Sequence, residues 1–265
     1  MLDCSEKSLI DHWYPVMRAE EAEKRHVARG QLLGEELAIW RDDDGKINVW
    51  ANRCPHRGVR LSIGANQGHS LQCRYHGWVF ESGSAQCIAI PAHPELKPAK
   101  AFKAQTFNAL EKYGYIWVNL GTASGTPAWP LTESGNALTL RSLAMRVSAP
   151  LIAEALLSAP SLSLRAHDAF TLEGTLHEGA FEARILIVLQ PMTQDLTTLH
   201  AVLINPPAQA DRIALLRQSN YLLTEARGIL ERSGKSRLAR DAPVAAAAQD
   251  YRGRIAGTLR YGVIA

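Results

Sequence analysis

Two short segments of the sequence each combine one cysteine with one histidine. Cys54 and His56 form a C-x-H pair, and Cys73 and His76 form a C-x-x-H pair after 16 intervening residues. Thiolates and imidazoles are common protein ligands of zinc and iron. The four residues therefore predict one metal centre held between two loops.

The mixed composition of each pair distinguishes between the kinds of centre that such ligands build. A structural zinc site also uses two cysteines and two histidines, but zinc fingers normally keep the two residue types in separate segments. In a Rieske-type [2Fe-2S] cluster two cysteines bind one iron and two histidines bind the other, so each loop supplies one ligand to each iron. The spacing therefore predicts a Rieske-type cluster bound by Cys54, His56, Cys73 and His76.

Residues beside the ligands agree with this prediction. Gly58 and Gly77 follow the two pairs and allow each loop to turn tightly, so that backbone amides approach the sulfur atoms. Trp78 comes next and can shield the centre from water.

The elements that have to position these loops are predicted to be short β-strands. Apolar or alternating segments, separated by turn residues, occur at 37–41, 48–51, 70–72, 78–81 and 114–119. A hairpin turn is predicted at 42–45 from its Asp-Asp-Asp-Gly sequence. The first half therefore reads as a small, mostly β domain.

The second half has a different character. Apolar segments at 183–189 and 199–203 predict strands, and the segments 209–232 and 242–259 predict helices. A stretch rich in Gly, Ser, Thr and Pro at 121–135 marks a boundary. The fold class is therefore α+β, with an all-β domain over 1–122 followed by an α+β domain over 123–265.

Several segments of the first half resemble a known family. The ligand segments are similar to the Rieske domain of ring-hydroxylating oxygenases, and three further segments resemble its vanillate O-demethylase branch. The matching segments are 54–58 and 73–78 for the domain, and 12–16, 90–92 and 112–118 for the branch. The resemblance implies an all-β Rieske domain, a helix-grip-like catalytic domain, a reductase of flavin or ferredoxin type as partner, and a head-to-tail trimer.

The second half departs from that family where a mononuclear ferrous iron is expected. The family binds this iron through two histidines and one carboxylate, with the histidines in an Asn-x-x-Asp-x-x-His-x-x-x-x-His pattern. Glu225 lies next to the carboxylate position but would point about 100° away around a helix. The aligned positions carry no ligating side chain: Ala155, Ser158, Ser161, Ala166 and Ala226. The comparison implies a shortened catalytic-like domain without this iron site, and we assign no catalytic residue.

These features favour an electron-transfer component of an oxygenase system. It would accept electrons from a reductase and pass them to a catalytic iron on a partner subunit, such as an intact oxygenase paralogue. One alternative is a complete monooxygenase acting on a small aromatic compound, with a rearranged iron site drawn from His167, Asp168, His177 or Glu178. A second alternative is a non-catalytic redox sensor or scaffold.

Four arginines surround the cluster segments: Arg53, Arg57, Arg60 and Arg74. They are equally compatible with a docking face for an acidic reductase and with solvated loop residues.

Composition excludes several other classes of protein. The net charge is +3 with 21% charged residues and no Lys/Arg-rich block, so we expect no nucleic-acid or membrane partner. Apolar runs are far shorter than the roughly 20 residues of a membrane span. The N-terminus lacks the layout of a secretory signal, which favours a cytoplasmic protein. With only four cysteines, a disulfide framework is not expected, and Cys4 and Cys87 are predicted to be free thiols.

Overall fold

A computed structural model describes residues 2–122, 127, 137–159, 162–178, 181–206 and 212–239. The chain divides into two compact units, which we call the first unit (Cys4–Ala128) and the second unit (Trp129–Ala265 with Met1–Asp3). No helix within the described ranges is long and apolar enough to cross a membrane.

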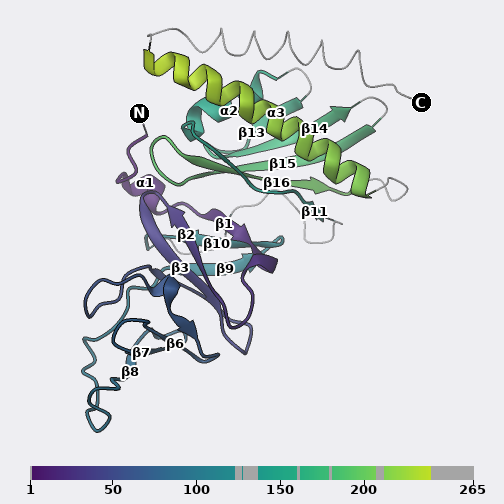
Figure 1. The fold of residues 1–265 in the computed structure, drawn as a ribbon. Coiled ribbons are helices and arrows are strands. Elements are labelled where there is room, and N and C mark those ends of the chain that lie inside the picture. Colours follow the sequence, from purple (N-terminus) through teal and green to yellow (C-terminus); the bar gives the residue numbers. More distant parts are fainter. Residues whose placement is uncertain are drawn as a thin grey trace. The chain divides into compact units, whose positions relative to one another are not determined.

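The first unit is built almost entirely from short antiparallel strands (Figure 1). Its elements are α1 (Lys7–Ile10), β1 (Tyr14–Arg18), the 3₁₀ turn η1 (Ala19–Glu21), β2 (Val27–Leu32), β3 (Glu35–Arg41), β4 (Ile47–Ala51), the 3₁₀ turn η2 (Leu61–Ile63), β5 (Ala65–Asn66), β6 (Ser70–Gln72), β7 (Val79–Glu81), β8 (Cys87–Ala89), β9 (Asn108–Lys112) and β10 (Tyr115–Asn119). They form three sheets with the orders β1-β10-β9, β2-β3-β4 and β5-β6-β7-β8.

Aromatic side chains join two of these sheets in one core. Trp40 on β3, Trp50 on β4 and Phe80 on β7 are almost completely buried. The rings of Trp40 and Trp50 meet edge to face with centroids 5.2 Å apart, and Trp50 meets Phe80 at 6.5 Å. Such arrangements add favourable ring interactions to the burial of apolar area. Cys54 and Cys73 belong to the same core, so the packing of the sheets fixes the base of both cysteine-containing loops.

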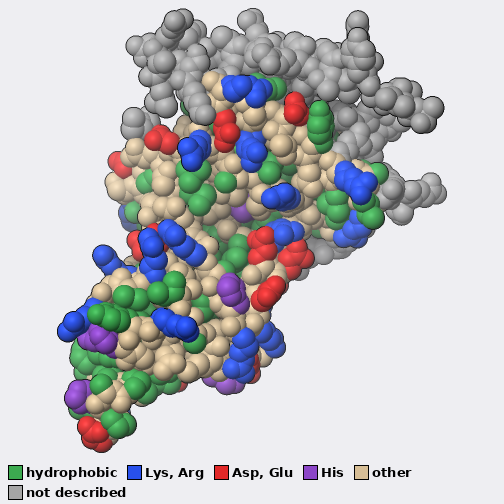
Figure 2. Space-filling view, in the orientation of Figure 1, with side chains coloured by type: hydrophobic (Ala, Val, Ile, Leu, Met, Phe, Trp, Pro, Cys, Tyr) green, Lys and Arg blue, Asp and Glu red, His purple; other side chains and the backbone are tan. Residues whose placement is uncertain are grey.

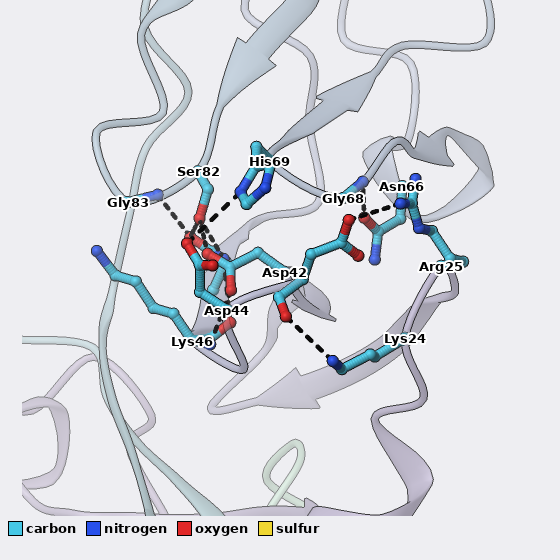
Figure 3. Close-up of polar contacts among 12 residues, drawn as sticks. Lys24, Arg25, Asp42, Asp44, Lys46, Asn66, Gly68, His69, Ser82 and Gly83 are labelled. Atoms are coloured by element: carbon cyan, nitrogen blue, oxygen red, sulfur yellow. Dashed lines mark hydrogen bonds and ion pairs between the residues drawn. The ribbon is translucent and has the colours of Figure 1, made fainter.

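A polar network joins the β3–β4 turn to the β7–β8 turn (Figure 3). The carboxylate of Asp42 is buried and accepts hydrogen bonds from Ser82 Oγ at 2.6 Å and from the Lys46 N–H at 2.8 Å. Asn48 Oδ1 accepts the Gly83 N–H at 2.7 Å. Burial alone would raise the pKa of Asp42, but the hydrogen bonds from Ser82 and backbone amides hold it below its usual value. The charged carboxylate therefore braces the two turns.

The second unit contains a larger antiparallel sheet with α3 running across it (Figure 1). Its elements are β11 (Ala137–Thr139), β12 (Leu143–Met145), α2 (Ala149–Leu157), β13 (Leu162–Ala166), β14 (Thr171–Glu178), β15 (Phe181–Pro191), β16 (Thr197–Ile204) and α3 (Arg212–Ala239). The strand order is β11-β16-β15-β14-β13, and β12 also pairs with β16. Helix α2 packs on β13 and β15.

The predicted fold class is confirmed, as a mostly-β unit is followed by an α+β unit. The predicted strands coincide with β3, β4, β6, β7, β10, β15 and β16, and the 42–45 turn lies between β3 and β4. The helix predicted over 209–232 begins at Arg212 and continues to Ala239. The helix predicted over 242–259 lies outside the described residues.

One histidine is enclosed in the sheet of the second unit. His200 on β16 is 1% exposed, and its Nδ1 and Nε2 atoms lie 2.8 Å from Ser142 Oγ and from Gln190 Oε1. Burial lowers the pKa of His200 to about 3. The side chain is therefore neutral in the folded protein throughout the physiological pH range.

We expect the folded second unit to lose stability as the pH falls below about 6.5, the ordinary histidine pKa. The unfolded chain then binds a proton at His200 that the folded chain excludes, so this residue lowers the free energy of unfolding by up to about 1.4 kcal/mol per pH unit. His200→Gln should flatten the dependence between about pH 3 and 6.5. Urea unfolding at several pH values measures this, with His167→Gln, at an exposed position, as control. An unchanged slope in His200→Gln would contradict the assignment.

Candidate metal centre

The four predicted ligands lie on two loops with the same backbone design. The first ligand loop, 54–58, follows β4, and the second ligand loop, 73–77, joins β6 to β7. In each loop the cysteine N–H donates to the carbonyl of the fifth residue after it at 2.8 Å. The glycine N–H donates back to the cysteine carbonyl, at 2.8 Å in the first loop and 3.1 Å in the second. Gly58 and Gly77 have φ of 71° and 70°, a region that favours glycine.

The loops bring the predicted ligands together as two pairs, with the cysteines inside and the histidines at the edge. Cys54 and Cys73 are each 3% exposed, whereas His56 and His76 are half-buried. The two histidine Nδ1 atoms lie 3.1 Å apart. Two nitrogen ligands, each about 2.1 Å from one tetrahedral metal ion, are separated by about 3.4 Å. The separation of the two histidine nitrogens is therefore close to that of two ligands of one metal ion.

The local electrostatics act differently on the two kinds of ligand. Burial raises the pKa of the Cys54 thiol to about 11, and Cys73 adds to the rise, although backbone N–H groups of the first ligand loop donate to the sulfur and oppose it. Burial and the neighbouring His76 lower the pKa of His56, which favours the neutral imidazole. Because metal ligands must be deprotonated, binding at Cys54 would release its proton. Amide hydrogen bonds to the sulfur are one of the factors that set a cluster's reduction potential.

The described side chains form pairs of possible metal ligands. Within the part of the chain that the structure describes, no three or more His, Cys, Asp or Glu side chains are placed to hold one metal ion. A Rieske cluster needs fewer protein ligands at each metal than a single-ion site, because each iron takes only two. Two cysteines and two histidines on facing loops are therefore a fitting set.

Aromatic rings cover both histidines. Trp78 stacks on His56 with ring centroids 4.4 Å apart and an interplanar angle of 5°. The ring of Tyr75 is tilted by 33° against that of His76, with centroids 3.8 Å apart. The two imidazoles are 4.7 Å apart, so the four rings form a row. Phe102 packs on Trp78 at 5.0 Å. Tyr75, at the end of the row, is 58% exposed to solvent. Its position next to His76 in the sequence could have indicated that it lies beside this ligand.

The positions aligned with the family's histidine pattern do not share one helix in the second unit. Ala155 lies in α2, Ser158 follows its last residue, and Ala166 lies on β13. Ser161 is outside the described residues. The helix ends before Pro160, as expected because the residue before a proline disfavours helical backbone. The described positions of this pattern provide no ligating side chain.

The position aligned with the carboxylate ligand lies on α3. Ala226 is buried, with 3% of its surface exposed, and the adjacent Glu225 is exposed. This difference is the one that helical geometry predicts for neighbouring residues, which lie about 100° apart around the axis. Glu225 therefore does not replace a carboxylate at the Ala226 position.

The set suggested for a rearranged iron site is only partly described. Asp168 Oδ1 accepts the N–H groups of Phe170 and Thr171 at 2.7 and 2.8 Å, so it caps a turn. His167 lies beside it and is exposed. The side chains of His177 and Glu178 lie outside the described part of the chain.

Comparison with known proteins decides the family of the first unit. Residues 12–107 match the family model of the Rieske [2Fe-2S] domain. This segment is a Rieske [2Fe-2S] domain. The Rieske domain in turn implies a [2Fe-2S] cluster.

Relatives that match the chain include proteins named as an oxidoreductase, a dioxygenase subunit and a demethylase. The chain is 50% identical over 118 residues to Oxidoreductase NdmD of Pseudomonas putida, covering 44% of this chain and 20% of the relative. It is 34% identical over 125 residues to the 3-chlorobenzoate-3,4-dioxygenase oxygenase subunit of Comamonas testosteroni, covering 46% and 29%. It is 32% identical over 142 residues to Methylxanthine N1-demethylase NdmA of Pseudomonas putida, covering 51% and 40%. The chain thus spans less than half the length of each.

The fold of most of the chain is similar to that of solved structures. Dicamba monooxygenase bound to dicamba aligns with a TM-score of 0.74 at 17% identity, covering 95% of this chain and 98% of the other. The NdmA QL mutant of Pseudomonas putida CBB5 with theobromine aligns at 0.73 and 18% identity, covering 92% and 89%. At these identities the likeness shows the fold. With the Rieske domain, it confirms the predicted resemblance to Rieske non-heme iron ring-hydroxylating and demethylating oxygenases.

Gly77→Ala is expected to lower the cluster content of the protein. A Cβ at this position would lie 3.0 Å from Pro91 Cγ, and φ is 70°, so the second ligand loop would have to shift. Gly45→Ala is the matched control, because Gly45 has φ of 89° but nothing within 4 Å of an added Cβ. Iron and acid-labile sulfide per folded chain should fall by roughly twofold or more in Gly77→Ala alone. Equal cluster content in the two variants would contradict the importance of this turn.

Proposed function

We propose that this chain is a Rieske electron-transfer component of a ring-hydroxylating or demethylating oxygenase system. It binds a [2Fe-2S] cluster through Cys54, His56, Cys73 and His76. It accepts electrons from a reductase of flavin or ferredoxin type and passes them to a catalytic iron on a partner subunit. When bound, the cluster supplies a store for one electron at a time.

The arrangement of the two ligand loops is the observation that carries this proposal. The cysteines are buried in the core, while the imidazoles of His56 and His76 converge at the edge with Nδ1 atoms 3.1 Å apart. The buried side holds the centre rigidly, because Cys54 and Cys73 pack in the aromatic core. The half-buried imidazoles give a short route between the centre and a partner protein.

A further observation supports a role in electron transfer. In the second unit, the described positions aligned with the family's iron ligands carry alanine or serine. We therefore divide the chain into a Rieske domain at 1–122 and a shortened catalytic-like domain at 123–265 that lacks the mononuclear iron.

The same considerations suggest the setting in which the chain works. The named relatives act on chlorobenzoate and methylxanthine compounds, so we propose a small aromatic or related heterocyclic compound as the substrate of the system. An intact oxygenase paralogue is the proposed acceptor. A head-to-tail trimer would place the cluster of one subunit beside the iron of the next.

The extent of the fold match favours a second candidate, a complete monooxygenase. The alignment with dicamba monooxygenase covers 95% of this chain and 98% of the other, so the second unit retains the architecture of an oxygenase domain. This candidate requires a mononuclear iron bound by residues other than those aligned with the family's ligands. A third iron per chain would distinguish it from the electron-transfer component.

His76→Ala is expected to abolish the rhombic Rieske EPR signal of the dithionite-reduced protein, because histidine ligation of one iron is what defines this cluster type. His69→Ala is the matched control, since His69 is exposed and lies on the segment between the two ligand loops. Its signal should equal that of the wild type. A Rieske signal that survives in His76→Ala at wild-type intensity would contradict the ligand assignment.

A further inference from the structure

The residue before each ligand cysteine covers the glycine of its own loop. In the first ligand loop, a Cβ at Gly58 would lie 3.5 Å from Arg53 Nε. In the second ligand loop, a Cβ at Gly77 would lie 3.5 Å from Gln72 Nε2. Arg53 is exposed and charged, whereas Gln72 is a half-buried neutral amide. The two loops therefore share a backbone design but differ in the group that covers it.

A chain of side-chain hydrogen bonds fixes the amide of Gln72. Ser70 Oγ donates to Gln67 Oε1 at 3.2 Å, and Gln67 Nε2 donates to Gln72 Oε1 at 3.0 Å. Gln72 Nε2 in turn donates to the Gly77 carbonyl at 3.4 Å. Because an amide donates through nitrogen and accepts through oxygen, these bonds give both amides a single orientation. We call Ser70, Gln67 and Gln72 the amide relay, and its last donor is directed at the second ligand loop.

Apolar packing reaches the same glycine. A Cβ at Gly77 would lie 3.0 Å from Pro91 Cγ. Pro91 belongs to a segment with exposed apolar side chains, namely Ile88, Leu96 and Phe102. Figure 2 shows hydrophobic side chains gathered at the β8 end of the first unit. Such packing restricts the position of Gly77 but does not orient its carbonyl, which receives its hydrogen bond from Gln72.

The Gly77 peptide connects groups that set the geometry of the predicted cluster site. Its N–H closes the loop on the Cys73 carbonyl at 3.1 Å, and His76 precedes it in the chain. Its carbonyl belongs to the peptide bond with Trp78, whose ring stacks on His56 of the first ligand loop. Rotation of this one peptide would therefore disturb ligands of both loops.

We propose that Gln72 is a positioning residue for the iron–sulfur cluster, and that the amide relay holds the second ligand loop in the geometry that the cluster needs. This inference rests on the proposed function, because it takes the four predicted ligands as given. The N–H dipole of Gln72 turns its positive end toward the loop. It therefore also favours the reduced cluster, which carries one more negative charge than the oxidised cluster.

The test uses three variants of the full chain with its cluster loaded. Gln72→Leu removes the donor and keeps a side chain of similar size. Gln67→Leu interrupts the amide relay one step further from the loop, at an exposed position. Asn108→Leu is the matched control: Asn108 Nδ2, on β9, also donates to a glycine carbonyl, that of Gly121 at 3.3 Å, but lies outside the ligand loops.

We expect Gln72→Leu to lose its cluster to an iron chelator about 10-fold faster than the wild type, because side chains that orient metal ligands commonly contribute this much. At the potential where the wild type is half reduced, its ratio of reduced to oxidised cluster should fall about threefold. The g values of its Rieske EPR signal should shift. Gln67→Leu should change all three quantities in the same direction by smaller amounts, and Asn108→Leu should match the wild type.

Chelator rate, redox ratio and g values in Gln72→Leu equal to those of Asn108→Leu would overturn the positioning role. Faster cluster loss with unchanged g values and redox ratio would also overturn it, because a loss of stability alone has that effect. Should Gln72→Leu fail to fold, Gln67→Leu decides, and wild-type values in that variant would overturn the proposal. A wild-type chain without a Rieske signal would instead overturn the proposed function.

Discussion

Each ligand loop is closed by two backbone hydrogen bonds, one from the cysteine N–H and one from the glycine N–H, around a glycine with positive φ. These bonds turn each short segment back on itself, so the cysteine side chain points into the core and the histidine side chain lies at the edge. Because 54–58 and 73–77 share this design, the two loops face each other as near-equivalents. The thiols are therefore separated from the imidazoles. This separation suits a cluster in which cysteines bind one iron and histidines bind the other.

The rest of the first unit fixes the position of the two ligand loops relative to each other. Trp40, Trp50 and Phe80 pack the β2-β3-β4 sheet against the sheet that carries the second ligand loop. At the turns, Asp42 and Ser82 tie the same two sheets together through a buried charged hydrogen bond. A rigid frame of this kind limits the movement of ligands when a metal centre gains or loses charge. The half-buried histidines still leave one edge open to partners.

The sequence predicts local features well and long-range contacts poorly. Ligand spacing and the apolar pattern of strands such as 70–72 and 114–119 are local, and the structure has β6 and β10 there. The strand β2 (Val27–Leu32) shows little alternation of apolar and polar residues and contains a glycine, so its sequence does not predict a strand. Its pairing with β3 stabilises the extended backbone. The stacking of Trp78 on His56 and the contact between residues 42 and 82 depend on tertiary packing, so no local pattern could predict them.

The proposed role in electron transfer depends on the second unit. Its central claim is that the cluster is the one iron centre of the chain. Iron and acid-labile sulfide, counted per chain in anaerobically purified full-length protein, test it most directly. The account predicts two irons and two sulfides per chain, as one [2Fe-2S] cluster contains. A third iron that stays bound through desalting and is not accompanied by sulfide would contradict it.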